Sequence, residues 1–324
     1  MTHGVRIHQT GGPDVLRWEV VELARLAAGE LRVRHAAIGV NFIDTYFRTG
    51  LYPTKLPTVL GSEAAGVIEE VGEGVTGFVK GDRVAYATGP LGAYAEARNV
   101  PAAHVVKLPD GIDDVTAAAS MLKGMTAQYL VRRTHAVQKG ETIVVHAAAG
   151  GVGLILCQWA KHLGATVIGT AGSEEKAKLA RAHGCEHVIL YRTEDVPKRV
   201  REITNGVGVP VVYDSVGKDT FAASLDCLRP RGLLVTFGQS SGAVPPFDPR
   251  VLSQKGSLFM TRPTLADYVR TRSELEETAR EVFDVIASGV VKISAAQTYP
   301  LRDAERAHRD LEARKTTGST VLLP

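Results

Sequence analysis

The stretch that decides the fold is residues 142–163, TIVVHAAAGGVGLILCQWAKHL. It opens with mostly β-branched residues, which predict a buried strand. Small residues and glycines follow over Ala147–Gly153, and apolar residues then recur every three or four positions, which predicts an amphipathic helix. A strand, a tight glycine-rich turn and a helix in this order present backbone N–H groups at a helix N-terminus, where phosphates bind. The stretch therefore predicts a dinucleotide site at Gly150, Gly151 and Val152.

The sequence around this stretch repeats the same alternation. From about residue 141, β-branched runs alternate with helical periodicity, which is typical of βαβ units and a parallel sheet. We expect strands at 142–146, 166–170, 187–191, 209–215, 233–238 and 257–261. Ser173 is a suitable N-cap for the second helix, and Gly184 follows its end. The predicted fold class is therefore α/β, with a Rossmann-type doubly wound parallel sheet.

The rest of the chain has a different texture. Residues 1 to about 122 are short apolar runs separated by turns, which predict a mainly β domain. After about residue 265 we expect a long helix at 265–288, a strand at 292–296, a helix at 302–314 and a strand at 319–323. Because 324 residues exceed the usual size of one core, we expect two domains. Their expected bounds are 1–124 with 266–324, and 125–265 for the dinucleotide-binding domain.

Composition excludes several classes of protein. The net charge of +3 is small and the basic residues are spread out, so nucleic-acid binding is not expected as a main function. No apolar run approaches the ~18 residues of a membrane span, and the N-terminus has no signal-peptide core. Cys157, Cys185 and Cys227 are odd in number and far apart, which predicts neither a disulfide framework nor a zinc knot. We expect a cytoplasmic protein without membrane insertion.

The residues after the second expected strand indicate which dinucleotide binds. Proteins that prefer NAD usually carry an acidic residue there for the ribose 2′-hydroxyl, and this chain has Gly172-Ser173 instead. Without a carboxylate to repel it, a 2′-phosphate could bond to Ser173 and pair with Lys176 one turn on. Tyr191 ends the third strand and should lie beside the same pocket. NADPH is therefore the expected cofactor, the alternative being that Lys176 is an ordinary solvated lysine.

The later strands should end at the same edge of the sheet, where open parallel sheets bind ligands. The small and polar residues expected there could line the nicotinamide half of the cofactor, and they are Ser215, Phe237, Gly238 and Ser240. For Gln239 and Ser241, a role as turn formers is equally compatible with the sequence.

Several motifs together resemble the medium-chain dehydrogenase/reductase superfamily. They are the loop 147–153, the segments GVNFIDTY at 39–46, GSEAAGV at 61–67 and GDRV at 81–84, and VYDSVG at 212–217. Within it the chain resembles the NADPH:quinone oxidoreductases of the zeta-crystallin type. The resemblance implies a GroES-like catalytic domain, a Rossmann domain, an active site in the cleft between them, and a homodimer joined through the Rossmann sheets.

The sequence departs from the zinc alcohol dehydrogenases of the same superfamily. Those enzymes carry a cysteine in the segment matching 41–46 and a histidine at the position of Ser62, and some have a four-cysteine lobe that is missing here. Amide and hydroxyl oxygens are poor substitutes for thiolate and imidazole, so no catalytic metal is expected. Without that Lewis acid, alcohol oxidation is disfavoured, whereas a quinone is already a strong electrophile.

The resemblance implies a set of site residues. Asn41 should lie near the nicotinamide and donate a hydrogen bond to the acceptor carbonyl, and Tyr46 and Tyr52 should offer phenols and an apolar wall. Asp44 either contacts the cofactor or holds its segment through local hydrogen bonds. The full set of expected cofactor contacts is Asn41, Asp44, Thr126, Gly150, Gly151, Val152, Gly172, Ser173, Lys176, Tyr191, Ser215, Phe237, Gly238, Ser240 and Arg262.

Two other functions compete with NADPH-dependent quinone reduction. An NADPH-dependent 2-alkenal or enone reductase needs the same fold and the same hydride, with an added proton donor at the α-carbon. A binding or structural role, as an AU-rich RNA-binding or crystallin-like protein, belongs to a different class. The modest charge of the chain argues against RNA.

Overall fold

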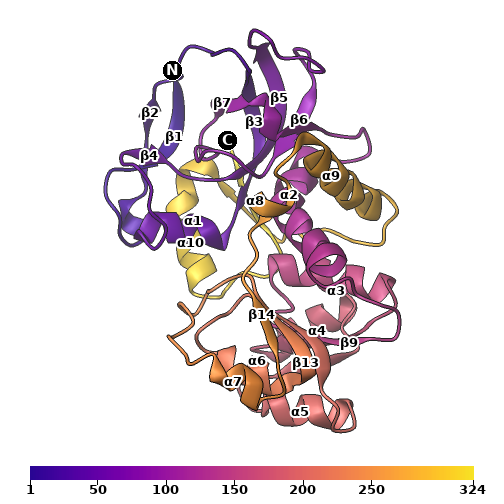
Figure 1. The fold of residues 1–324 in the computed structure, drawn as a ribbon. Coiled ribbons are helices and arrows are strands. Elements are labelled where there is room, and N and C mark those ends of the chain that lie inside the picture. The colour runs from indigo at the N-terminus through magenta and orange to yellow at the C-terminus, as the bar shows by residue number, and fades with distance from the viewer. The chain divides into compact units, whose positions relative to one another are not determined.

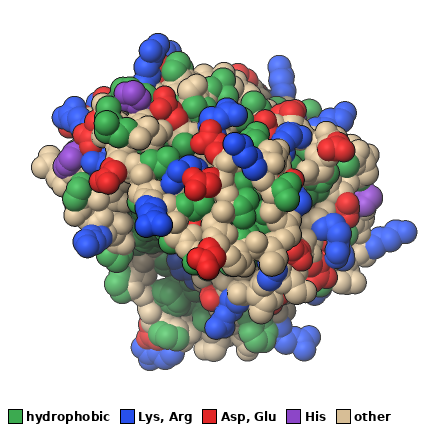
Figure 2. Space-filling view, turned by 90° about the horizontal axis from the view of Figure 1, so that it is seen from above, with side chains coloured by type: hydrophobic (Ala, Val, Ile, Leu, Met, Phe, Trp, Pro, Cys, Tyr) green, Lys and Arg blue, Asp and Glu red, His purple; other side chains and the backbone are tan.

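The computed structural model describes residues 1–324 in full and divides them into two compact units (Figure 1). The first unit comprises Met1–Met125, Val269–Ala287 and Ile293–Pro324, and the second comprises Thr126–Tyr268 and Ser288–Lys292. No helix of the chain is both long and apolar enough to cross a membrane. On the face drawn in Figure 2, basic and acidic side chains are interspersed and no large patch of one sign is visible.

A six-stranded parallel sheet forms the centre of the second unit. Its strands lie in the order β11, β10, β9, β12, β13, β14, and all pairs are parallel. Their bounds are β9 Thr142–Val145, β10 Thr166–Ala171, β11 His187–Leu190, β12 Val209–Asp214, β13 Leu228–Thr236 and β14 Phe259–Thr261. The strand order reverses between β9 and β12, which is where sheets of this kind bind ligands. The predicted doubly wound sheet is confirmed.

Helices connect or follow these strands, and the four that lie between β9 and β13 in the chain bury apolar side chains. Their bounds are α3 Gly151–His162, α4 Glu174–Ala182, α5 Val196–Ile203, α6 Phe221–Cys227, α7 Arg250–Gln254 and α8 Leu265–Tyr268, with a π-helical turn at Leu130–Thr134. Ser173 caps α4 as expected, because its Oγ accepts the N–H of Lys176 at 3.3 Å. β13 begins at Leu228 rather than at 233, since Leu228 already pairs with Val209 ahead of a bulge.

The first unit is mainly β, as predicted. A seven-stranded sheet has the order β15, β16, β3, β5, β6, β8, with β7 paired to β3, and a smaller sheet has the order β2, β1, β4. The strands are β1 Thr2–Ile7, β2 Arg17–Val21, β3 Glu30–Val40, β4 Thr58–Val59, β5 Glu63–Val71, β6 Arg83–Tyr86, β7 Ala97–Pro101, β8 Val105–Lys107, β15 Gln297–Pro300 and β16 Thr320–Leu323. The helices are α1 Phe42–Thr49, α2 Asp114–Tyr129, whose residues from Thr126 on belong to the second unit, α9 Arg272–Ala287 and α10 Ala304–Glu312. Three 3-10 turns lie at Pro13–Val15, Ala102–His104 and Leu301–Asp303.

The C-terminal segment rejoins the first unit, because β16 pairs with β3 through Thr320 and Val40. Two details of its prediction are wrong. The helix expected at 265–288 is two helices, α8 and α9, because Thr271 and Glu274 cap a new helix through reciprocal backbone-to-side-chain hydrogen bonds. The strand expected at 292–296 lies at Gln297–Pro300, where it finds its pairing partner in β16.

Candidate active site

The glycine-rich loop of the second unit leaves backbone donors without partners. Two of its N–H groups are used within the fold, that of Ala148 by Thr170 O at 3.1 Å and that of Gly150 by Ala147 O at 2.9 Å. Gly150 is the N-cap of α3 and contributes no side chain to the cap. The N–H groups of Gly151 and Val152, in the first turn, bond to no other group of the chain. They are suited to bind an anion at the positive end of the helix.

The loop approaches α3 so closely that a side chain would not fit at Gly153. A Cβ there would lie 2.4 Å from the carbonyl oxygen of Ala147 and 2.8 Å from that of Ala148. Ala147 itself has a φ of 52°, a left-handed conformation that is uncommon for a residue with a side chain. The tight turn and the unpartnered donors together fit a pyrophosphate group.

A buried polar network lies directly before the loop. His146 is 2% exposed; its Nδ1 lies 3.1 Å from Thr170 Oγ1 and its Nε2 lies 3.0 Å from Ser224 Oγ. Ser224 donates to Asp214 Oδ2 at 2.8 Å, so its oxygen can only accept from His146, which places the imidazole proton on Nε2. Burial lowers the pKa of His146, opposed by the charge of Asp214. The network fastens the ends of β9, β10 and β12 to α6.

Four residues expected to select the cofactor come together at the ends of β10 and β11. A Cβ on Gly172 would lie 2.5 Å from Tyr191 Oη, so the phenol of Tyr191 stands against this glycine. Ser173 uses its oxygen to cap α4 and keeps its hydroxyl proton to donate. Lys176 follows within the first turn of the same helix. No acidic residue ends β10, and Glu174 pairs with Arg181 at 3.5 Å.

The residues expected around the nicotinamide also gather at one place. Ser240 donates its N–H to Ser215 O at 3.2 Å, and a Cβ on Gly238 would lie 2.7 Å from the same oxygen. Phe237 donates its N–H to Asp214 O, and Arg262 Nη1 lies 3.4 Å from Gly238 O. These residues thus form one loop cluster, whose contact with a cofactor stays a prediction.

Three further residues on this part of the chain had less definite roles. Ser241 accepts the N–H of Asp219 and donates to Val216 O at 2.8 Å, so the structure favours the turn-forming alternative for Ser241. Gln239 lies in the same turn and its carbonyl accepts the N–H of Gly242. Thr126 is buried within α2.

In the first unit, Asn41 is held by the hydrogen bonds that it donates to two carboxylates. Asn41 is the N-cap of α1, and its backbone N–H donates to Asp44 Oδ2 at 2.8 Å. Its Nδ2 donates to Glu63 Oε2, also at 2.8 Å. Asp44 therefore holds its segment through local hydrogen bonds, one of the two alternatives that the sequence left open. Burial raises the pKa of Asp44 to about 7.

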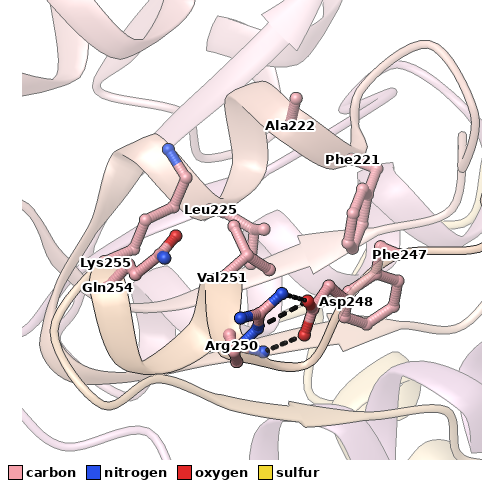
Figure 3. Close-up of a pocket in the computed structure, with 9 residues that line it drawn as sticks. All are labelled: Phe221, Ala222, Leu225, Phe247, Asp248, Arg250, Val251, Gln254 and Lys255. Carbon is pink, nitrogen blue, oxygen red and sulfur yellow. Dashed lines mark hydrogen bonds and ion pairs between the residues drawn. The ribbon is translucent and has the colours of Figure 1, made fainter.

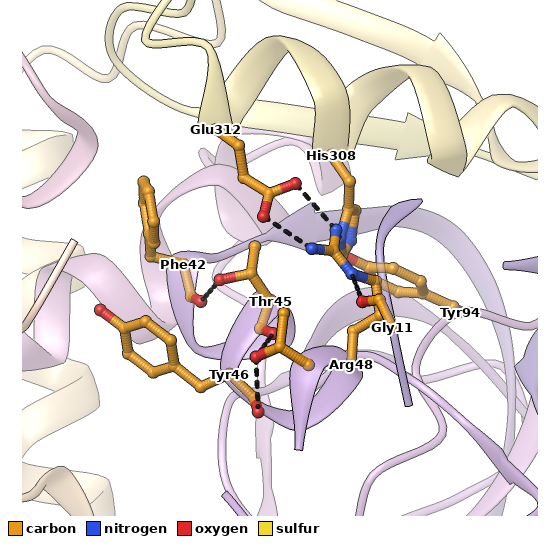
Figure 4. A network of polar contacts seen from close by, with 9 residues as sticks. Gly11, Phe42, Thr45, Tyr46, Arg48, Tyr94, His308 and Glu312 are labelled. Carbon is orange, nitrogen blue, oxygen red and sulfur yellow. Dashed lines mark hydrogen bonds and ion pairs between the residues drawn. The ribbon is translucent and has the colours of Figure 1, made fainter. Parts of the chain in front are cut away.

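Aromatic rings pack against one another along α1 and just after it. The ring centroids of Tyr46 and Tyr52 lie 5.3 Å apart in an edge-on arrangement, and Phe42 packs against Tyr46 at 6.1 Å. In Figure 4 the rings of Phe42 and Tyr46 lie on the opposite side of α1 from Arg48. The structure thus brings the two expected tyrosines together and adds Phe42, which the sequence analysis did not single out.

The other side of α1 is fixed to α10 by a buried chain of hydrogen bonds (Figure 4). Arg48, 1% exposed, forms a two-pronged ion pair with Glu312 at 2.6 and 3.0 Å and donates to His308 Nδ1 at 3.1 Å. His308 Nε2 then lies 3.0 Å from the hydroxyl of Tyr94, which donates to Asp44 at 2.9 Å. Burial, with the charge of Arg48, lowers the pKa of His308 to about 3, so this histidine is neutral.

Two parts of the chain match known families. Residues 27–110 match the alcohol dehydrogenase GroES-like domain, and residues 151–288 match the zinc-binding dehydrogenase family. A quinone oxidoreductase of Pseudomonas aeruginosa is 55% identical over 325 residues, with both chains covered completely. The solved structure of Escherichia coli quinone oxidoreductase complexed with NADPH has a TM-score of 0.98 and 52% identity, covering 99% of this chain and 100% of that one.

The chain belongs to the quinone oxidoreductase family. A 2-haloacrylate reductase of a Burkholderia species is nearly as similar, with 52% identity over 98% of each chain. Relatives that share more than half of their residues with this chain are therefore named for two different activities.

One matched family is named for binding zinc, but the side chains of this chain do not form a group of zinc ligands. Ser62 is 9% exposed and stands beside Glu63, and no three His, Cys, Asp or Glu side chains of residues 1–324 are grouped to hold a metal. Cys157 and Cys185 lie 3.4 Å apart, sulfur to sulfur, although 28 residues separate them. The absence of a catalytic metal stays a prediction that rests on the donor types at positions 41, 44 and 62.

Sequence reasoning missed Glu63, Lys123 and His308. Glu63 accepts hydrogen bonds from Asn41 and from Lys123, at 2.8 and 3.2 Å, and His308 connects Arg48 to Tyr94. The one available signal was the charge of Glu63 next to the apolar run Ala64–Ile68, because a carboxylate that is buried with such a run needs a buried partner.

One surface pocket of about 310 Å³ includes none of the residues expected to bind the cofactor or the acceptor (Figure 3). It is lined by Phe221, Ala222, Leu225, Phe247, Asp248, Arg250, Val251, Gln254 and Lys255. Its charged groups are already paired, Arg250 with Asp248 and Lys255 with Asp226. An apolar floor with neutralised charges offers no acid–base chemistry.

Proposed function

We propose that the protein is an NADPH-dependent quinone reductase that works without zinc. The observation that carries the proposal is the pair of unpartnered N–H groups of Gly151 and Val152, next to a second strand that ends without an acidic residue. The first feature suits a pyrophosphate, and the second suits a 2′-phosphate on the adjoining ribose. The relatives named quinone oxidoreductase, one of them complexed with NADPH, support this function.

The residues of the second unit would hold the cofactor. The first turn of α3 binds the pyrophosphate through its backbone, and Ser173 and Lys176 bind the 2′-phosphate by a hydroxyl donor and a charge. Tyr191 flanks the adenosine, and Ser215, Phe237, Gly238, Ser240, Thr126 and Arg262 line the nicotinamide half. When bound, NADPH supplies a hydride to the acceptor.

Residues of the first unit orient the acceptor. The amide of Asn41 donates to the quinone carbonyl, where negative charge develops as the ring is reduced. Tyr46 and Tyr52 provide an aromatic wall for the ring and exclude water from it. One hydride and one proton convert the quinone to the hydroquinone, with NADP⁺ as the other product, so the protein needs to supply position and a proton route rather than a Lewis acid.

The domain assignment and the cellular location are part of the proposal. Residues 1–124 and 266–324 form the catalytic domain, and residues 125–265 form the NADPH-binding domain of a cytoplasmic enzyme. We test the zinc-free mechanism by metal analysis of the active protein. The expected result is activity without stoichiometric metal, and about one zinc per chain that is required for activity contradicts it.

A homodimer is a further part of the proposal. β14 is the last strand of its sheet, and Phe259 on it is 61% exposed. An exposed apolar edge strand is prone to pair with another chain, so we expect two copies to join β14 to β14. Sedimentation of the wild type as a dimer and of Phe259→Lys as a monomer supports this interface, and an unchanged dimer in the variant overturns it.

A 2-alkenal or enone reductase is the second candidate, favoured by the similarity to 2-haloacrylate reductase. The two functions are separated by following NADPH consumption with 1,4-benzoquinone and with a 2-alkenal at matched concentrations. Faster turnover of the quinone supports the proposed function. Turnover of the alkenal alone replaces it with the second candidate.

A further inference from the structure

We propose that Glu63 is a positioning residue that fixes the amide of Asn41 for the acceptor, with Lys123 as its counter-ion. The inference rests on the proposed role of Asn41 in binding the acceptor carbonyl. We call Asn41, Glu63 and Lys123 the Glu63 cluster. All three lie in the first unit, on the N-cap of α1, on β5 and on α2.

The Glu63 carboxylate is completely buried and fully engaged. Its side chain is 0% exposed. Oε1 accepts the backbone N–H of Leu122 at 2.7 Å, and Oε2 accepts Nδ2 of Asn41 at 2.8 Å and Nζ of Lys123 at 3.2 Å. Three donors, two from α2 and one from the N-cap of α1, therefore converge on one carboxylate.

Such a carboxylate is costly to bury, and the fold makes specific provision for it. The ammonium of Lys123, 7% exposed, balances its charge. Gly39 on β3 leaves room for it, since a Cβ there would lie 2.2 Å from Glu63 Oε2 and 2.3 Å from the carbonyl oxygen of Ala118. An apolar side chain would stabilise the core more simply, so a role beyond stability explains the charge.

The carboxylate determines how the Asn41 amide is oriented. A carboxylate only accepts hydrogen bonds, so it must face Nδ2 rather than Oδ1 of Asn41. The backbone N–H of Asn41 is held by Asp44 at the same time. The residue is thus fixed at both ends, and the second N–H of Nδ2 remains as a donor of defined direction for a carbonyl oxygen.

Glu63→Gln tests this role because it removes the charge and little volume. Glutamine has one acceptor oxygen and one NH₂ donor in place of the two acceptor oxygens of Glu63. It can therefore accept the hydrogen bond of Leu122 or that of Asn41, but not both, and Asn41 loses its fixed orientation. We expect kcat with 1,4-benzoquinone to fall by about tenfold to a hundredfold, while the dissociation constant of NADPH changes less than about twofold.

Two further variants separate positioning from a merely structural role. Asp114→Asn makes the same chemical change on α2, where Asp114 pairs with Arg83 at 2.8 Å away from Asn41, and it should leave kcat within about twofold. In Glu63→Gln/Lys123→Met the uncompensated ammonium is gone, so thermal stability recovers relative to Glu63→Gln while kcat stays low. Recovery of kcat together with stability overturns the proposal.

A double-mutant cycle tests whether Glu63 acts through Asn41. In an Asn41→Ala background, Glu63→Gln should cause no further loss of kcat, because its target is already absent. A full additional loss in that background overturns the proposal.

A second measurement remains decisive if the wild type does not reduce 1,4-benzoquinone and the proposed function fails. In isotope-labelled protein, the side-chain NH₂ of Asn41 should exchange slowly with solvent in the wild type and rapidly in Glu63→Gln. Equal exchange in both proteins overturns the positioning role independently of activity.

Discussion

The loop Ala147–Gly153 of the second unit acts through backbone groups, whereas the Glu63 cluster of the first unit acts through side chains. The loop offers backbone N–H groups and depends on side chains being absent, since even a methyl group at Gly153 meets a carbonyl oxygen at 2.4 Å. The cluster offers an amide and depends on buried charges balancing each other within 3.2 Å. The loop therefore depends on steric fit, and the Glu63 cluster depends on the balance of buried charges.

This difference determines which changes disrupt each region. Backbone donors at a helix N-terminus carry no titratable group, so the loop should hold its ligand over a wide range of pH. Buried side chains respond to every change of charge around them. Substitutions in the two regions should therefore have different consequences, and the largest effect is expected in the loop.

Gly153→Ala should weaken NADPH binding by about a hundredfold or more, which corresponds to about 3 kcal/mol, because the added methyl pushes the loop away from α3 and displaces its donors. Titration of the protein with NADPH measures the loss. Gly111→Ala is the matched control, since a Cβ at Gly111 meets no atom within 4 Å. Equal affinity in the two variants would show that the loop does not bind the cofactor.

Lys176→Glu should weaken NADPH by about tenfold to a hundredfold and NADH by less than about threefold, since one charge-assisted hydrogen bond to the 2′-phosphate is lost and a repulsion is added. Ser173 and the first turn of α4 remain in place in this variant. Parallel titrations with the two cofactors check the ratio. An equal loss for both removes Lys176 from the phosphate site.

Much of the loop Ala147–Gly153 was predictable from the sequence, but little of the Glu63 cluster was. The glycine-rich loop, its flanking strand and its helix lie within 142–163, so local periodicity was enough to identify them. The bond from Lys123 to Glu63 spans 60 residues and that from Arg48 to His308 spans 260. No local pattern reports such contacts, because they arise only when β5, α2 and α10 pack.

One smaller miss has the same physical origin. The strand near the C-terminus lies at Gln297–Pro300 because β16 provides its hydrogen bonds there, and pairing rather than propensity decides such positions. Ser62, by contrast, was singled out as unlike a zinc ligand from its chemistry alone, and the absence of zinc stays a prediction. The neighbouring Glu63 was not singled out, since its importance lies in its partners.

The smallest predicted effect concerns pH and the buried histidine of the first unit. His308 has its pKa lowered to about 3 in the fold, from 6.5. A histidine kept neutral in this way stabilises the protein above pH 6.5, and the contribution is lost as pH falls toward 3. The groups that face it are Arg48 and Tyr94, with Glu312 and Asp44 bonded to them in turn.

The destabilisation caused by His308→Gln should therefore be larger at pH 7 than at pH 5.5, by about 1 kcal/mol. Burial raises the pKa of Asp44 to about 7, which acts in the opposite sense, but Asp44 is present in both proteins. Chemical denaturation of the two proteins at both pH values measures the difference. A difference that does not change with pH contradicts a neutral, buried His308.

The most direct test of zinc-free quinone reduction is a single-turnover experiment. Metal-depleted protein loaded with NADPH is mixed with 1,4-benzoquinone. Each bound NADPH should be oxidised once and one hydroquinone should form, with a rate that falls in Asn41→Ala while NADPH stays bound. Oxidation that requires added zinc, or bound NADPH that reduces a 2-alkenal and leaves the quinone untouched, would contradict it.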